Sequence, residues 1–183
     1  MNNLVGKILT APPNVKGNFW SKTVIFLTED HARGSVGFVL NKPTKMTISE
    51  FSLQHGIESN VQGFLHVGGP VSVNALTVLH SSEWACNNTM KITDDFCLSS
   101  SGDLLLKFAL GDMPKHWRMF AGMCAWSPNQ LESEIKGLPP YNHDFSWLTS
   151  TPSIKTVFGH DEKEQWTTSI EKCSIEFAQS IFA

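Results

Sequence analysis

Two short apolar runs near the N-terminus constrain the fold of this chain more than any other feature. Residues 23–27 read TVIFL and residues 35–40 read SVGFVL, and neither run contains a charged side chain. Short runs rich in β-branched and aromatic residues, without a polar break, are typical of strands that are buried on both faces. The polar loop over residues 29–34 ends in glycine, so we expect the two strands to form a β-hairpin.

The next segments contain signals for both helices and strands. Thr47 and Glu50 form a capping-box pattern, in which each side chain accepts a hydrogen bond from the other residue's backbone N–H. A short helix should follow and end at Gly56. The run Gly68-Gly69-Pro70 is typical of a turn. We expect strands over residues 4–10, 64–67 and 75–80, and a polar surface loop over residues 81–89.

Single strands alternate with helices in the second half of the chain. Residues 116–126 carry several large apolar side chains and are expected to form a central strand. We expect helices over residues 102–110 and 128–136 and from residue 162 onward, with caps at Ser101, Ser127 and Asp161. Short strands are expected over residues 146–148 and 154–158.

This order of elements favours a mixed sheet within a single domain. Hairpin-like pairs come first and single strand–helix steps follow, whereas a doubly wound sheet would alternate more regularly. A length of 183 residues suits one domain, and 41% hydrophobic residues can supply its core. The sequence has no internal repeat and no linker, so residues 1–183 are treated as one domain.

The charge balance argues against nucleic acid as a partner. The chain has 14 Lys and Arg residues against 17 Asp and Glu residues, a net charge of −3. A duplex-binding surface usually leaves a basic excess, because it must neutralise phosphates. The longest basic cluster is only residues 115–118.

The termini and the cysteines indicate a cytoplasmic protein. The first residues lack the charged segment and long apolar run of a signal peptide. No apolar stretch reaches the ~18 residues of a membrane span, so we expect no membrane association. The four cysteines are far apart in the sequence and are expected to be reduced thiols: Cys86, Cys97, Cys124 and Cys173.

The sequence predicts neither a metal nor a cofactor. None of the seven histidines pairs with another at the spacing of metal ligands, and Cys-x-x-Cys does not occur. The turn at residues 68–70 lacks the glycine spacing and following helix of a phosphate-binding loop. A tight turn or bulge is the better interpretation of these glycines.

Cys124 stands where a catalytic nucleophile would be sought, before a helix. The stretch from Gly122 to Trp126 superficially matches a nucleophile elbow, but bulky Trp126 occupies the position that needs a small residue. With Ser127 as N-cap, Pro128 as first helical residue and Gln130 completing a capping box, Cys124 falls inside the strand. We therefore interpret this stretch as a capped corner with a buried cysteine.

The order of several motifs resembles the AlgH/YqgE family of uncharacterised conserved bacterial proteins. The resemblance covers most of the chain and rests on five segments. These are LTAPPNVKGNFWSKTVIFLTEDHARGSVGFVLNKP (9–43), VGGPVSVNALTVLHS (67–81), MFAGMCAWSPNQLESEI (119–135), SWLTS (146–150) and VFGHDEKEQW (157–166).

The resemblance implies an α+β fold with a bifurcated mixed β-sheet curled into a pseudo-barrel and helices around it. It implies no catalytic residues, and the name of one branch suggests a transcriptional regulator. This chain departs from the family at three places. Cys124 lies where the family usually has alanine, Asn129 stands where the family often has glycine, and residues 176–183 replace a tail of small residues.

We expect a non-enzymatic cytoplasmic protein that binds a protein or small-molecule partner, with a regulatory role as one form of this function. The residues selected for its binding surface are Lys42, Gly68, Gly69, Trp126 and Gln130. One alternative is a hydrolase-like enzyme with a loop-assembled site, in which Cys124 or Ser127 works with His116 or His143. The other alternative is a transcriptional regulator.

Overall fold

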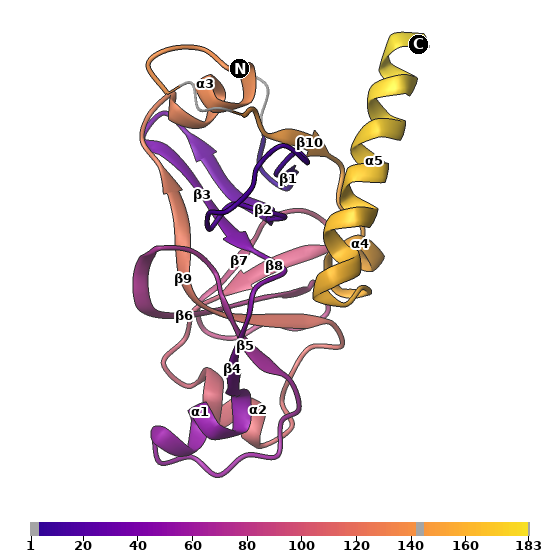
Figure 1. The fold of residues 1–183 in the computed structure, drawn as a ribbon. Coiled ribbons are helices and arrows are strands. Elements are labelled where there is room, and N and C mark those ends of the chain that lie inside the picture. Colours follow the sequence, from indigo (N-terminus) through magenta and orange to yellow (C-terminus); the bar gives the residue numbers. More distant parts are fainter. Residues whose placement is uncertain (1–3, 142–144, 183) are drawn as a thin grey trace.

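The structure is a computed structural model that describes residues 4–141 and 145–182. The described residues form ten strands and five helices (Figure 1). In chain order these are β1 (Ile8–Thr10), β2 (Val24–His31), β3 (Gly34–Val39), β4 (Pro43–Thr47), α1 (Ile48–Gln54), β5 (Phe64–Val67), β6 (Val71–Ser81), β7 (Thr89–Lys91), β8 (Phe96–Ser99), α2 (Leu104–Ala109), β9 (Trp117–Trp126), α3 (Gln130–Lys136), β10 (Leu148–Ser150), α4 (Ile154–Phe158) and α5 (Glu162–Phe182).

The predicted hairpin is confirmed as β2 and β3. The two strands are antiparallel, with Ile25 opposite Val39 and His31 opposite Gly34. Alternate side chains enter two separate core clusters: Ile25 and Leu27 pack with Trp126 in one, whereas Phe26 and Phe38 pack with Phe120 in the other. Because both faces of the hairpin are covered, its strands need no polar alternation.

Strand β9 divides the sheet into two branches. Its last residues pair with β3, whereas Phe120 and Ala121 pair with β5 on one side and β6 on the other. The β5–β9 pair is parallel and the other pairs are antiparallel, so the sheet is mixed as predicted. The curled, bifurcated sheet with its surrounding helices confirms the predicted α+β fold.

Glycines allow the close backbone contacts at this branch point. A Cβ on Gly68 would lie 2.1 Å from the Gly122 carbonyl oxygen, and one on Gly69 would lie 2.2 Å from the Met123 carbonyl carbon. Gly68 also joins three strands, because its N–H donates to the Ala121 carbonyl and its carbonyl accepts from Val39 N–H. The glycine pair thus has a structural role at the branch point.

The helices are distributed around the two branches of the sheet. Helices α1 and α2 lie at the lower end of Figure 1, α3 lies at the upper end, and α4 and α5 lie along one side. The predicted capping box at Thr47 and Glu50 is confirmed. Asp161 also caps α5 as predicted, because its carboxylate accepts from the N–H groups of Lys163 and Glu164. None of the helices that the structure describes is both long and apolar enough to cross a bilayer.

The structure corrects two predictions of local structure in this part of the chain and adds one hairpin. Residues 154–158 form helix α4, because Ser153 and Thr156 cap it reciprocally and only Val157 of the segment is fully buried. Helix α2 begins at Leu104 without a side-chain cap, since the Ser101 hydroxyl bonds to the Asp103 carboxylate instead. The hairpin of β7 and β8 was missed because these are short strands in a polar region.

Candidate functional site

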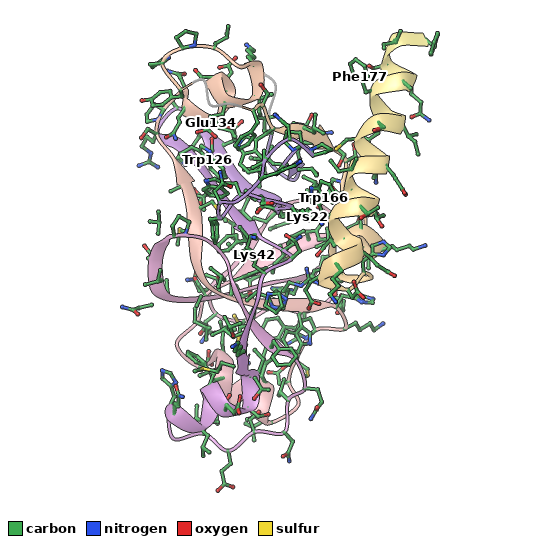
Figure 2. All side chains as sticks on the ribbon, in the orientation of Figure 1. Lys22, Lys42, Trp126, Glu134, Trp166 and Phe177 are labelled. Atoms are coloured by element: carbon green, nitrogen blue, oxygen red, sulfur yellow. The ribbon has the colours of Figure 1, made fainter. Side chains whose placement is uncertain are left out.

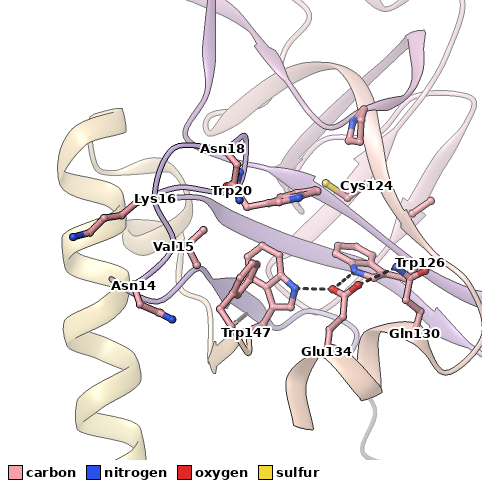
Figure 3. A pocket seen from close by; sticks show the side chains of 13 residues that line it. Asn14, Val15, Lys16, Asn18, Trp20, Cys124, Trp126, Gln130, Glu134 and Trp147 are labelled. Atoms are coloured by element: carbon pink, nitrogen blue, oxygen red, sulfur yellow. Dashed lines mark hydrogen bonds between the residues drawn. The ribbon is translucent and has the colours of Figure 1, made fainter. Parts of the chain in front are cut away.

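A cavity of about 430 Å³ opens beside the upper end of the sheet (Figure 3). Five segments build it: the loop before β2, the turn between β5 and β6, the C-terminal end of β9, helix α3 and the segment before β10. The residues that line it are Asn14, Val15, Lys16, Asn18, Trp20, Pro70, Cys124, Ala125, Trp126, Gln130, Glu134, Phe145 and Trp147. Three tryptophans and a phenylalanine are the largest side chains of its wall, which also carries polar residues.

The carboxylate of Glu134 organises this wall. Its Oε2 accepts hydrogen bonds from the indole N–H of Trp126 at 3.0 Å and of Trp147 at 2.9 Å. Its Oε1 accepts from the side-chain amide of Gln130 at 2.9 Å. Glu134 is only 4% exposed, and a buried carboxylate is stable only when hydrogen bonds replace its lost water. The carboxylate therefore fixes both indole rings in place.

The start of α3 aims Gln130 and Glu134 at the cavity. Gln130 accepts from Ser127 N–H at 2.9 Å, which is one half of the predicted capping box. The predicted N-cap was wrong, because Asn129 occupies that position with a left-handed backbone (φ 63°) and the helix begins at Gln130. A left-handed backbone before the helix suits Asn or Gly, so Asn129 is a residue type that this position accepts.

The other aromatic residues extend the wall by edge contacts. The rings of Trp20 and Trp147 are 5.7 Å apart and nearly perpendicular, and those of Phe145 and Trp147 are 5.2 Å apart. Edge-to-face packing is the favoured geometry for aromatic pairs. Figure 3 shows Trp20 and Trp126 on the side of the cavity near Cys124, with Trp147 beside Glu134.

Comparison with known proteins places this chain in a family. The sequence profile described as AlgH-like (DUF179) matches residues 8–178, which is most of the chain. The chain belongs to the AlgH-like family. A UPF0301 protein of Shewanella denitrificans is 30% identical over 183 residues, covering 98% of this chain and 96% of the relative. A UPF0301 protein of Paracoccus denitrificans is also 30% identical, over 182 residues, covering 96% of this chain and 92% of that protein.

Solved structures share the fold of this AlgH-like chain. The solution structure of AlgH from Pseudomonas aeruginosa superposes with a TM-score of 0.74 and 23% identity, covering 93% of this chain and 89% of that chain. The crystal structure of a Corynebacterium diphtheriae protein gives a TM-score of 0.68 at 17% identity, covering 88% and 82%. At these identities the comparison shows the fold alone.

The structure brings together two of the five residues that were selected from the sequence. Trp126 and Gln130 both line the cavity of this AlgH-like protein. Gly68 and Gly69 lie behind it, in the backbone contacts at the branch point. Lys42 lies apart from Trp126 and Glu134 (Figure 2) and its ammonium donates to the Ser21 carbonyl at 3.4 Å. Partial burial lowers the pKa of Lys42.

Cys124 is a poor candidate for a nucleophile. It is 1% exposed, and its thiol donates to the Gly68 carbonyl at 3.5 Å. Burial raises the pKa of Cys124 to about 12, so the thiolate that would react is scarce at neutral pH.

The remaining residues of the hydrolase alternative form no site with Cys124 in the described part of the chain. His116 stacks on Phe158, with ring centroids 6.1 Å apart. Ser127 lies exposed before α3, and His143 lies outside the described residues. Within residues 4–141 and 145–182, no group of three or more His, Cys, Asp or Glu side chains could hold a metal ion.

Sequence reasoning missed Glu134, Trp20 and Trp147. A signal for Glu134 was present, because it lies three positions after Leu131, a core-facing residue, and so shares its side of the helix. A carboxylate at a core-facing position requires buried donors. The sequence does not identify those donors, since Trp126 and Trp147 are brought to α3 only by the folded chain.

Proposed function

We propose that this protein is a cytoplasmic binding protein that takes up a small organic molecule in the aromatic cavity beside α3. The observation that carries the proposal is the wall of three tryptophans, two of them fixed by the buried Glu134 carboxylate. Ligand sites are typically concave, largely preformed and apolar, with a few placed polar groups. A volume of about 430 Å³ lies in the usual range for such sites.

Binding fits the chemistry of the cavity better than turnover. The sulfur atom on its wall belongs to Cys124, whose raised pKa keeps it a thiol. The side chains of Gln130 and Glu134, which α3 contributes to the cavity, are held in place by hydrogen bonds. Such fixed polar groups suit a rigid recognition site. Four free thiols support the cytoplasmic location. A regulatory role is part of this proposal, because a ligand would contact several segments of the chain, from the loop before β2 to the segment before β10, and would stabilise them together.

The proposal is tested by screening a fragment library against the whole protein by NMR, with the indole N–H resonances as reporters. We expect fragments to shift the indole resonance of Trp147 and to protect the protein thermally. Trp20→Ala should abolish these shifts, because it removes a half-buried wall of the cavity. Trp84→Ala is the matched control, since Trp84 lies in another part of the core and bonds to Asp112.

The result that would overturn the proposed function is equally direct. If no fragment perturbs the cavity indoles at millimolar concentration, or if Trp20→Ala and Trp84→Ala bind fragments alike, the cavity is not the ligand site.

A further inference from the structure

We propose that the projecting C-terminal end of α5, residues 177–182, binds the same surface of a second copy of this chain, so that the protein forms a twofold-symmetric dimer. The proposal follows from the burial, the residue types and the charge of this helix end. None of the described residues of α5 lines the aromatic cavity, so the dimer is independent of the proposed ligand site.

The first part of α5 is held against the rest of the molecule. It packs against α4, β1, β2 and β10. Among the described residues, its last hydrogen-bonded link to the sheet is Glu176, whose carboxylate accepts from Thr151 N–H at 3.1 and 3.0 Å. Beyond Glu176 the helix extends past β10 in Figure 1, and each of residues 177–182 is exposed. Figure 2 shows Phe177 on this projecting part, far from Trp166 near the start of the helix.

The projecting end continues the row of side chains with which α5 packs on the sheet. Gln165, Ser169 and Cys173 are buried at four-residue spacing, and residues four apart are neighbours on one side of a helix. The next two members of this row are Phe177 and Ile181, which are 68% and 61% exposed. The row therefore carries large apolar side chains where the chain itself leaves them uncovered.

The apolar face is large enough for a weak but specific dimer. Ile175 and Phe182 widen the face of Phe177 and Ile181, and they are 57% and 88% exposed. A fully buried aromatic side chain covers about 150–250 Å², so the four side chains together expose roughly 500 Å². Pairing two copies then buries roughly 1,000 Å², which reaches the lower limit of specific interfaces. A twofold axis needs only this one patch, because both copies contribute the same surface.

The residue types on this face favour a second copy over a different protein. Residues 177–182 carry no charged side chain, so two copies can meet there without repulsion although the chain has a net charge of −3. Homodimer interfaces are more apolar than those between different proteins, and their centres are depleted of charge. Rows of side chains at four-residue spacing also suit ridge-into-groove packing between two helices.

The same residue types disfavour a lipid bilayer as the partner of this face. Helices that lie on membranes are typically rich in Lys and Arg on their polar side, and these residues attract anionic lipids. The charged side chain within residues 174–182 is that of Glu176, and Lys172 pairs with it at 3.9 Å. The helix end therefore lacks the electrostatic part of membrane binding.

Sedimentation equilibrium of the whole protein over a range of concentrations tests the dimer. We expect the average mass to rise with concentration from 20.3 kDa toward twice that value. The Kd should lie at about 1–100 μM, because the interface is small and specific interfaces of larger area begin at micromolar affinity.

Two variants show whether the end of α5 holds the copies together. Phe177→Glu combined with Ile181→Glu should raise the Kd at least about 100-fold, because like charges would meet at the twofold axis. Leu110→Glu is the matched control and should leave the Kd unchanged, since Leu110 is 76% exposed and follows α2 at the other end of the molecule. Circular dichroism checks the fold of each variant. If the double variant does not fold, Phe177→Ala is measured instead and should weaken the dimer about tenfold.

Three results would overturn the dimer. The first is a mass of 20.3 kDa at every concentration up to several hundred micromolar. The second is an unchanged Kd in the variants of Phe177, since another surface would then join the copies. The third is a monomer that co-sediments with vesicles of phosphatidylglycerol and phosphatidylethanolamine, which would assign the face to a membrane. Loss of fragment binding at the cavity bears on the proposed function and leaves the dimer standing.

Discussion

Glu134 shows at the residue scale how one buried charge organises a site. Its carboxylate replaces the water around two indole N–H groups and one amide, and in return those donors make its own burial tolerable. The neighbouring Glu132, two positions earlier on the same helix, forms only an exposed ion pair with Lys136. The two glutamates therefore allow a matched comparison of a buried and an exposed carboxylate.

Glu134→Ala should lower the free energy of unfolding by about 2–4 kcal/mol, because it leaves two buried indole N–H groups without an acceptor. Glu132→Ala should lower it far less, because the ion pair of Glu132 with Lys136 is exposed to solvent. Urea unfolding followed by circular dichroism measures both. Similar losses for the two variants would show that the indole bonds contribute little.

A second residue-scale prediction concerns the thiol of Cys124. With its pKa raised to about 12, it should resist alkylation at pH 8, whereas the more exposed Cys86 reacts. A raised pKa means that folding favours the protonated thiol. This effect leaves stability unchanged at pH values below the unfolded pKa near 9, and it destabilises the fold as pH rises from there toward 12.

Peptide mapping by mass spectrometry after brief treatment with iodoacetamide locates the labelled cysteines. Labelling of Cys124 should appear only in denaturant. If Cys124 in the native protein reacts as fast as Cys86, its burial is wrong and the hydrolase alternative regains support.

At the scale of elements, α3 depends on the residue that precedes it. Asn129 has φ 63°, a conformation that costs most L-residues roughly 1–2 kcal/mol but is tolerated by Asn and Gly. Its conformation turns the chain from β9 into α3 and so places Glu134 over Trp126. The position of the short helix thus depends on the left-handed backbone of Asn129 as well as on the apolar face of the helix.

Asn129→Ala should destabilise the protein by about 1 kcal/mol, because alanine lacks the local hydrogen bonding that helps Asn adopt left-handed backbone. Asn129→Gly is the matched control and should be neutral or slightly stabilising, because glycine adopts left-handed backbone without a steric penalty. Thermal unfolding of both variants gives the comparison. A glycine variant that is less stable than the alanine variant would contradict this account.

At the scale of the whole molecule, the branch point in β9 joins the two halves of the sheet. Gly122 has φ 77°, and a Cβ there would lie 2.5 Å from the Gly69 carbonyl oxygen. Beyond this residue β9 leaves β5 and pairs with β3, which carries Trp126 to the cavity. Substitution at Gly122 therefore disturbs both branches and the site together.

Gly122→Ala should cost at least about 2–3 kcal/mol, combining the left-handed backbone with a steric clash. Gly56→Ala is a close control, because Gly56 has φ 75° but open space around its Cα. Gly56→Ala should lower the free energy of unfolding by about 1–2 kcal/mol, which is the cost of left-handed backbone without a steric clash. Chemical denaturation measures the difference, and equal losses would show that the branch point accommodates a methyl group.

The sequence by itself determined the local parts of this protein. The β2–β3 hairpin, the helix capped by Thr47, the central β9 strand and the start of α5 at Asp161 were all predicted, because each depends on neighbouring residues. Residues 154–158 were wrongly predicted as a strand, because their apolar residues are compatible with a strand or a helix. The local signal that decided for a helix was the cap at Ser153.

Only the tertiary structure decided the site. Trp20, Trp126, Glu134 and Trp147 come from four separate segments, and their contacts depend on how β9 divides between β3 and β5. The spacing of apolar residues in the sequence indicates which face of a helix or strand is buried. It does not indicate which distant element covers that face. Trp126 and Gln130 were selected from their motif, whereas the carboxylate that links them was recognised only from the hydrogen bonds that folding creates.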